Sequence, residues 1–126
     1  MKVVTDSKDV VLNIHQMVTF IGQLQVVTGE GALFDHVDEG LPMWSESGDR
    51  SVEVKVRFKT PFLGAPGVIA HIIGMDSACD SNQRYWLNVK NVGSHGFSLK
   101  FNTWGDTRIA RVGVSWQAIG QKLSAQ

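Results

Sequence analysis

The sequence predicts an all-β protein, a six-stranded antiparallel β-sandwich that follows a short N-terminal helical or extended leader. Apolar and polar residues alternate strictly along residues 52–59, 97–102 and 111–116, which is the period of a strand with one buried and one wet face. Glycine and proline separate these short runs, and no apolar pattern of helical length interrupts them. A parallel sheet with crossover helices is therefore not expected. A length of 126 residues fits a single core.

Residues 1–21 differ from the rest, and we assign them to a leader or oligomerisation segment before a β-sandwich domain at residues 22–126. Apolar residues recur at spacings of 3, 4 and 3, at Val11, Ile14, Val18 and Ile21. That spacing is typical of a coiled-coil seam and favours a helix, packed on its own domain or bundled with copies of the chain. The β-branched residues of the segment leave an N-terminal strand as an alternative, and a disordered leader is another.

The six strands of the sandwich are expected at residues 24–28, 52–59, 68–75, 84–92, 97–102 and 111–119. Residues 29–49 hold several glycines and an acidic run and are expected to form a loop. Residues 68–75 are almost wholly apolar, which predicts a central strand covered on both faces. Gly93 and Gly96 bracket a hairpin link.

Composition excludes several functions. The chain has 12 basic and 12 acidic residues and a net charge of zero, so it lacks the basic face that a nucleic-acid partner requires. The lone cysteine, Cys79, allows neither an internal disulfide nor a cysteine-rich zinc site. No apolar run is long enough for a membrane span or for a signal peptide. These observations leave a cytoplasmic, non-classically exported or virion-associated protein, with no insertion into a membrane.

The sequence contains no recognisable catalytic or metal-binding pattern. The four histidines stand at no metal-ligand spacing, at His15, His36, His71 and His95. It has no G-x-S-x-G elbow, no partnered nucleophile and no phosphate-binding glycine loop. We therefore expect a protein that is not an enzyme and has no metal or other cofactor.

Tryptophan is frequent, with four residues in the chain. Trp116 shares a strand face with apolar residues and is expected in the core, whereas Trp86 and Trp104 fall on the polar side of their strands, as does Arg84. An outward tryptophan is expected to be covered by a planar ligand, such as the apolar side of a sugar ring, or by a neighbouring subunit. The guanidinium of an arginine presents N–H donors in a fixed geometry that matches two neighbouring oxygens of a sugar. A carboxylate can accept hydrogen bonds from the sugar hydroxyls.

A series of motifs runs through residues 54–120. They are Val56-Arg-Phe58, Thr60-Pro-Phe62, residues 68–76, Arg84, Val92-Gly-Ser-His-Gly-Phe97, Thr103-Trp-Gly-Asp-Thr107 and Val114-Ser-Trp-Gln-Ala-Ile-Gly120. Together they resemble the H-type lectin domain, the family of the snail agglutinins and of the C-terminal part of discoidins. The resemblance implies a six-stranded sandwich that forms trimers, sometimes stacked into hexamers. It also implies binding of galactose-type sugars, notably N-acetylgalactosamine, near subunit boundaries.

The resemblance further implies a set of sugar-binding residues. Arg84 corresponds to the arginine that grips the axial hydroxyl, and Trp104 with the following Gly105 corresponds to the hydrophobic wall. The loop aspartate of the family falls on Ser47 when residues are counted without gaps, and on Asp49 when the loop shifts by two residues. Gly105 stands where the family often has a large residue, so this wall is reduced. The disulfides of the snail lectins have no counterpart.

The sequence thus predicts a non-enzymatic carbohydrate-binding module. Its expected partners are glycans of the galactose or N-acetylgalactosamine type and copies of itself, because a homotrimer or hexamer presents several weak sites together. The alternative is a structural trimerisation or attachment module, for example of a phage fibre or surface appendage, with a degenerate sugar site.

Overall fold

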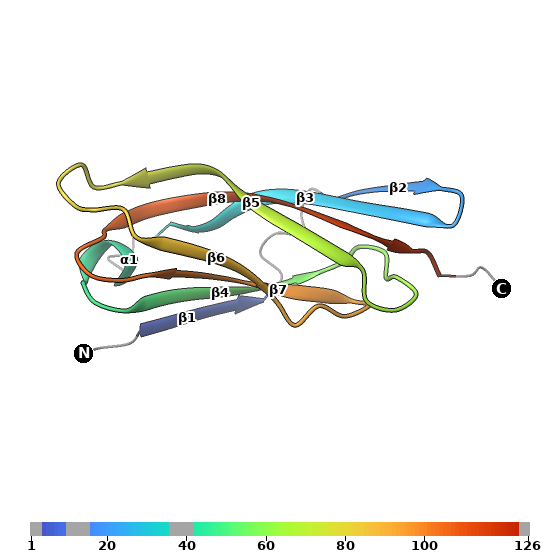
Figure 1. The fold of residues 1–126 in the computed structure, drawn as a ribbon, viewed down its shortest axis with the longest axis horizontal. Coiled ribbons are helices and arrows are strands. Elements are labelled where there is room, and N and C mark those ends of the chain that lie inside the picture. Colours follow the sequence, from blue (N-terminus) through green and yellow to red (C-terminus); the bar gives the residue numbers. More distant parts are fainter. Residues whose placement is uncertain (1–3, 10–15, 36–41, 124–126) are drawn as a thin grey trace.

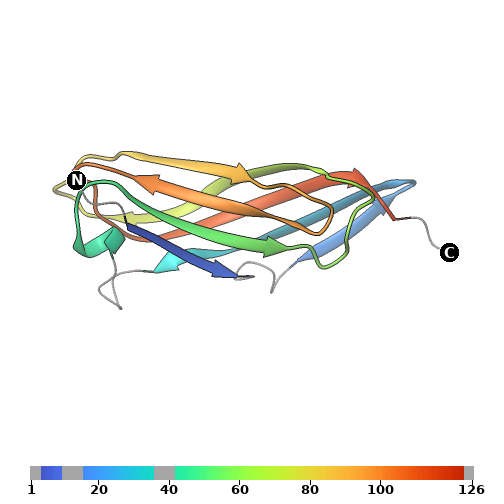
Figure 2. The same cartoon turned by 90° about the horizontal axis from the view of Figure 1, so that it is seen from below.

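Two β-sheets pack face to face in the computed structural model, which describes residues 4–9, 16–35 and 42–123 (Figures 1 and 2). One sheet has the strand order β1-β4-β7-β6 and the other the order β2-β3-β8-β5. The strands are β1 (Val4–Asp9), β2 (Met17–Ile21), β3 (Leu24–Asp35), β4 (Arg50–Arg57), β5 (Gly67–Ser77), β6 (Tyr85–Lys90), β7 (Gly96–Thr103) and β8 (Ile109–Gln121). A short helix, α1 (Pro42–Ser45), precedes β4. The described strand pairs are antiparallel except β1 and β4, which run parallel.

The predicted all-β sandwich is confirmed, and its six expected strands correspond to β3 through β8. The leader adds β1 and β2, so six is too low a number for the described part of the chain. The extended form of the leader is therefore correct at residues 4–9 and 17–21, and the helical form is wrong there. Val11 and Ile14 of the predicted coiled-coil seam lie outside the described residues.

The strand β2 extends the second sheet by pairing with β3, with Val18 opposite Val27. Its β-branched residues suit a pleated surface. The two-residue link between the strands begins at Gly22, whose φ of 61° is a conformation that glycine adopts without strain. Both leader strands are thus paired within the sheets, while the division of the chain into two segments after residue 21 stays a prediction.

The predicted loop at residues 29–49 is wrong over its first part, because β3 continues to Asp35. Gly29 lies opposite Trp116 of β8, and a Cβ at this position would stand 2.6 Å from the indole ring. The glycine is therefore a packing requirement inside a strand rather than a turn.

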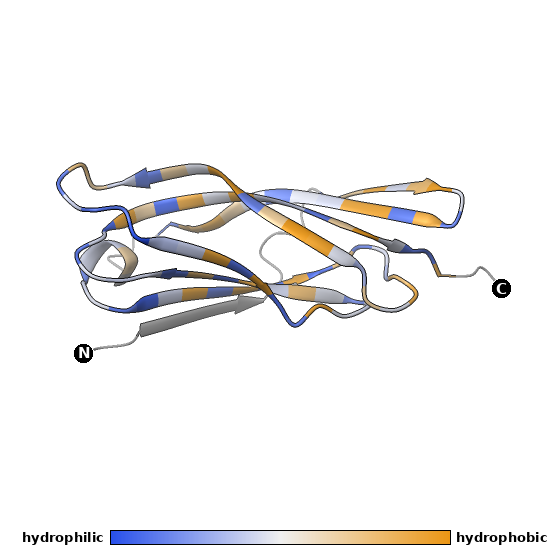
Figure 3. Ribbon diagram, in the orientation of Figure 1, coloured by the Kyte–Doolittle hydropathy of each residue, from blue (hydrophilic) through white to orange (hydrophobic). Residues whose placement is uncertain are grey.

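The prediction of a central, doubly covered strand at residues 68–75 is also wrong. The strand β5 lies at an edge of its sheet, next to β8. Its residues alternate between exposed and half-buried, and Ile69 is 66% exposed. Hydrophobic residues run along β5 (Figure 3), and the exposure of Ile69 shows that part of this apolar run faces outward, where His71 is also exposed.

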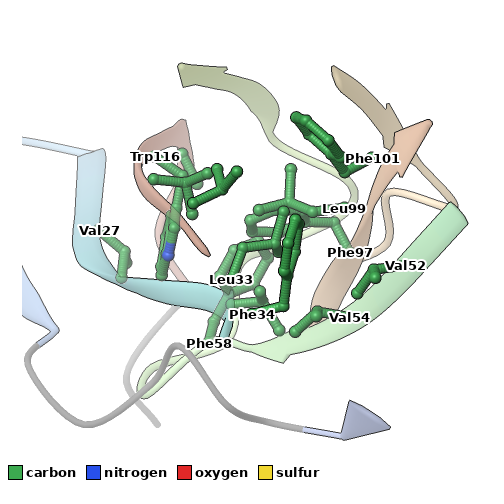
Figure 4. Close-up of a cluster of buried hydrophobic side chains, with 14 of the residues drawn as sticks. Val27, Leu33, Phe34, Val52, Val54, Phe58, Phe97, Leu99, Phe101 and Trp116 are labelled. Carbon is green, nitrogen blue, oxygen red and sulfur yellow. The ribbon is translucent and has the colours of Figure 1, made fainter. Parts of the chain in front are cut away.

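The core lies between the sheets, where side chains from both meet (Figure 4). Trp116 of β8 packs edge-on against Phe97 of β7, with ring centroids 5.2 Å apart, and Phe58 lies 5.9 Å from the same indole. Trp116 is a core residue, as predicted. Burying one such side chain stabilises the fold by roughly 1.5–3 kcal/mol. Further core side chains are Val27, Leu33, Phe34, Val52, Val54, Leu99 and Phe101.

Candidate functional site

Three segments meet at the end of the sandwich that carries α1 (Figure 1). They are the loop at residues 46–49, Arg84 just before β6, and the turn at residues 104–107 that follows β7. Antiparallel pairing brings them together, because Thr103 at the end of β7 lies opposite the first residues of both β4 and β6. All the residues predicted for a sugar site therefore lie at this end.

Two buried threonines fix the backbone around Arg84. The Thr103 hydroxyl donates to the Arg84 carbonyl oxygen (2.7 Å), and the Arg84 N–H donates to the Thr107 hydroxyl oxygen (3.0 Å). Thr107 in turn donates to the Asn82 carbonyl oxygen (2.5 Å). The motif Thr103-Trp-Gly-Asp-Thr107 thus holds the chain before β6 against the turn after β7.

A buried arginine, which the sequence analysis did not single out, joins the loop to the turn. Its guanidinium donates to the carbonyl oxygens of Met43 (3.3 Å), Glu46 (2.8 Å), Gly48 (2.9 Å) and Gly105 (3.4 Å). This residue, Arg50, is 1% exposed. Burial lowers the pKa of Arg50 and the neighbouring carboxylates of Glu46 and Asp49 raise it, with a net lowering. An arginine nevertheless stays charged, so it serves as a permanent donor that positions the site.

Arg84 is paired with a carboxylate that the sequence analysis also missed. Its Nη1 donates to Oδ1 of Asp106, and the Asn82 side-chain amide donates to both oxygens of the same carboxylate (3.5 and 3.4 Å). Loss of solvation raises the pKa of Asp106, but the hydrogen bonds from Arg84 and Asn82 bring it below its ordinary value. The side chains of Arg84 and Asp106 are 37% and 54% exposed, so the ion pair is open to a ligand.

A shallow groove of about 290 Å³ adjoins the turn. It is lined by Asp49, Arg50, Ser51, Lys100, Asn102, Thr103 and Trp104. Trp104 is 41% exposed and supplies an apolar wall. The other walls include the carboxylate of Asp49, the ammonium group of Lys100 and the amide of Asn102. One aromatic surface with a few polar groups around it is typical of a small-ligand site.

The structure distributes the predicted residues over this end. Asp49 and Trp104 line the groove together. Gly105 lies against Arg84, because a Cβ on Gly105 would stand 3.3 Å from the Arg84 Nη1. Ser47 is exposed in the loop and is not a wall of the groove.

Asp106 is not expected from the sequence, because the family resemblance places the sugar-binding aspartate in the loop at Ser47 or Asp49. The signal that points to Asp106 is its place between Trp104 and Thr107, within a motif already recognised. In the described part of the chain, the carboxylate that pairs with Arg84 comes from this turn and not from Asp49.

Other candidate chemistry is not assembled within residues 16–35 and 42–123. No three His, Cys, Asp or Glu side chains cluster there in the manner of a metal site. His71 and His95 are exposed, and Cys79 is an exposed free thiol, while His15 and His36 lie outside the described residues. In the same part of the chain, no helix is long and apolar enough to cross a membrane.

Comparison of the chain with known proteins identifies its family. Residues 53–119 match the H-type lectin domain. A protein of Fuscovulum blasticum, "ATP synthase subunits region ORF 7", is 38% identical over 92 residues, which are 73% of this chain and 80% of that protein.

Two solved structures share the fold. Wild-type discoidin II of Dictyostelium discoideum has a TM-score of 0.69 at 24% identity, over 80% of this chain and 38% of discoidin II. An N-truncated R1-type pyocin tail fibre has a TM-score of 0.54 at 14% identity, over 86% of this chain and 87% of the fibre chain. This chain therefore spans well under half the length of discoidin II. The family match at residues 53–119 covers more than half of this chain and includes Arg84 and Trp104. The chain belongs to the H-type lectin domain family.

Proposed function

We propose that the chain is a multivalent lectin that binds a sugar of the galactose or N-acetylgalactosamine type beside Trp104. The observation that carries this proposal is the exposed ion pair between Arg84, just before β6, and Asp106, on the turn that follows Trp104. The guanidinium donates to two neighbouring sugar oxygens, and the carboxylate accepts from a hydroxyl. The indole of Trp104 covers the apolar C–H side of the ring.

Asp106 replaces the family's loop aspartate in this proposal. It lies in hydrogen-bond contact with Arg84, so a donor and an acceptor stand together as a hydroxyl requires. Asp49 lines the groove together with Trp104, where its carboxylate accepts from a further hydroxyl. Gly105 stands where relatives often have a bulkier residue, and the absence of a side chain there lets the Arg84 guanidinium lie against the turn.

A single site of this kind binds weakly. One charge-assisted hydrogen bond contributes roughly 1.5–3 kcal/mol, and an exposed indole adds burial. The resulting dissociation constant is on the order of millimolar. Useful binding to a glycan-covered surface then requires several sites on one particle, and we propose a homotrimer, alone or stacked into a hexamer.

The outer face of the β2-β3-β8-β5 sheet is the surface we assign to this assembly. It carries large apolar side chains that are exposed in the single chain. They are Met17, Ile21, Ile69, Ile73 and Ile119. Exposed apolar side chains on one face of a sheet are typical of a contact between subunits. Light scattering should therefore give the mass of an oligomer, and Ile69→Glu should reduce it to the mass of a monomer. Leu63→Glu, at an apolar residue of comparable exposure outside that sheet, is the matched control.

Calorimetric titration of the assembled protein tests the sugar site directly. We expect binding of galactose and N-acetylgalactosamine and much weaker binding of glucose and mannose, whose hydroxyl at C4 is equatorial rather than axial. Arg84→Gln should abolish binding and leave the oligomer intact, while Arg57→Gln, at an exposed residue near the other end of the same sheet, should change neither. If Arg84→Gln dissociates the oligomer, Arg84 is an interface residue instead.

A structural attachment module is the second candidate, supported by the fold shared with the pyocin tail fibre over 86% of this chain. In that case the assembled protein binds none of the sugars tested, although its mass is that of a trimer or hexamer. This outcome rejects the lectin proposal and retains the attachment role.

A further inference from the structure

Trp86 is a second exposed tryptophan, outside the groove described above. It lies on the edge strand β6, with its side chain 63% exposed. Its indole Nε1 donates to Oδ1 of Asn88, two residues along the same strand (2.8 Å). Because one face of a β-strand carries residues i and i+2, this bond holds the indole along the strand. The ring is thereby fixed in place while it remains open to solvent.

The strand register connects Trp86 to the groove beside Trp104. Trp86 lies opposite Asn102 of β7, and Asn102 is itself a wall of that groove. Trp104 follows Asn102 by two residues, just beyond the end of β7, and it lines the same groove as Asn102. Asn102 therefore connects the strand that carries Trp86 to the groove that Trp104 lines.

The surroundings of Trp86 are polar. Asn88 lies opposite Lys100, and Asn102 has Trp86 on one side and Ser51 on the other. A face for a protein partner is expected to be apolar at its centre. A single fixed indole among amide, ammonium and hydroxyl groups matches a sugar ring instead, which offers an apolar side and a rim of hydroxyls.

The size of the groove makes a second sugar unit useful. At about 290 Å³ the groove is at the low end of the roughly 300–1,000 Å³ typical of ligand pockets, so it accommodates a small ligand. A glycan that continues from this groove over Asn102 reaches Trp86. Because the indole is already held by Asn88, stacking a ring on it costs little side-chain ordering.

We propose that Trp86, with Asn88 and Asn102, forms an extension of the sugar site that binds the next unit of an oligosaccharide. The occupant is a neutral glycan whose terminal galactose-type unit binds the Arg84–Asp106 pair beside Trp104 and whose next unit lies over Asn102 against Trp86. This inference rests on the proposed function at Arg84 and Trp104. It assigns the preferred ligand as an oligosaccharide rather than a free monosaccharide.

Calorimetry with soluble, monovalent ligands tests this extension, because avidity does not contribute. The wild type is titrated with N-acetylgalactosamine and with a trisaccharide that ends in the same unit. We expect the trisaccharide to bind roughly tenfold more tightly. Trp86→Ala should reduce the affinity for the trisaccharide to that for the monosaccharide, and it should leave monosaccharide binding unchanged. Trp86→Phe keeps a flat ring and should retain part of the gain, and Lys90→Ala on the same strand is the control that should change nothing.

The outcomes separate this inference from the proposed function. Equal affinities of the wild type for the two ligands overturn the extension and leave the lectin function in place. The same holds if Trp86→Ala weakens both ligands equally, or if light scattering shows that it dissociates the oligomer, since Trp86 is then part of the first site or of a subunit contact. A wild type that binds neither ligand rejects the proposed function, and the extension with it.

Discussion

Arg50 and Gly105, separated by 55 residues in the sequence, are joined by a hydrogen bond from the Arg50 guanidinium to the Gly105 carbonyl oxygen (3.4 Å). The same guanidinium reaches carbonyl oxygens in α1 and in the loop before β4. The Gly48 N–H donates to the same Gly105 oxygen (2.9 Å). One buried cation thus sets the position of Asp49 relative to Trp104, and with it the shape of the groove.

Arg50→Met should lower the free energy of unfolding by about 2–4 kcal/mol, because it leaves several carbonyl oxygens without their donor. Methionine keeps most of the length of the side chain, so the loss reports the hydrogen bonds more than a cavity. Urea denaturation measures the change. Arg57→Met, at an exposed arginine of the same strand, should stay within about 0.5 kcal/mol of the wild type. Equal stability of the two variants would mean that the hydrogen bonds of the Arg50 guanidinium do not stabilise the fold.

Gly105→Ala should lower the free energy of unfolding by about 1–2 kcal/mol, because the φ of 70° at Gly105 costs a residue with a Cβ about that much. The new methyl group would also stand 3.3 Å from the Arg84 Nη1 and displace the guanidinium, so we expect weaker sugar binding in calorimetry. Gly93→Ala is the control, because no atom lies within 4 Å of its added Cβ. If Gly105→Ala binds as well as the wild type, Arg84 does not need its present position.

Gly29→Ala should be destabilising by about 1–3 kcal/mol, since the added methyl group overlaps the Trp116 indole at 2.6 Å and the packed core has no space for it. Thermal or urea unfolding gives the difference. Gly74→Ala is a matched control on another strand, because its Cβ meets no atom within 4 Å. A loss no larger than that of Gly74→Ala would mean that Trp116 moves aside at little cost.

The strands with one buried and one wet face could be predicted from the sequence, because alternation is a local pattern. The order of strands is not local, and for this reason the apolar run of β5 was misread as a central strand although it lies at an edge. Gly29 was misread as a turn because its partner, Trp116, is distant in the sequence.

The residues of the candidate site could likewise be predicted only where the signal is local in the sequence. Arg84 and Trp104 were identified from their strand face and from the family motif. Arg50 looks like an ordinary polar residue at the start of a strand, and its burial depends on segments up to 55 residues away. The pairing of Asp106 with Arg84 depends on the turn at Gly105, whose positive φ the sequence alone does not reveal.

The Arg84–Asp106 pair predicts a specific response to pH. The hydrogen bonds from Arg84 and Asn82 keep the pKa of Asp106 below its ordinary value, so the carboxylate is charged throughout the neutral range. The pair's contribution to stability is present above the unfolded pKa of about 3.9, and it is lost as the pH falls through the lower pKa of the folded state. Sugar affinity should follow the same course, constant from neutral pH to about 5 and reduced in more acidic solution.

Titration of the Asp106 carboxyl carbon by NMR checks this response without any ligand. We expect a pKa below about 3.9 in the wild type and a shift upward, toward that value, in Arg84→Gln, which removes the donor. Arg57→Gln should leave the titration of Asp106 unchanged. Asp106→Asn should bind sugar weakly at every pH and without the acidic decline, because no carboxylate is left to protonate. If the pKa of Asp106 is the same in Arg84→Gln as in the wild type, the pair does not exist in solution, and the sugar hydroxyl must find its acceptor at Asp49.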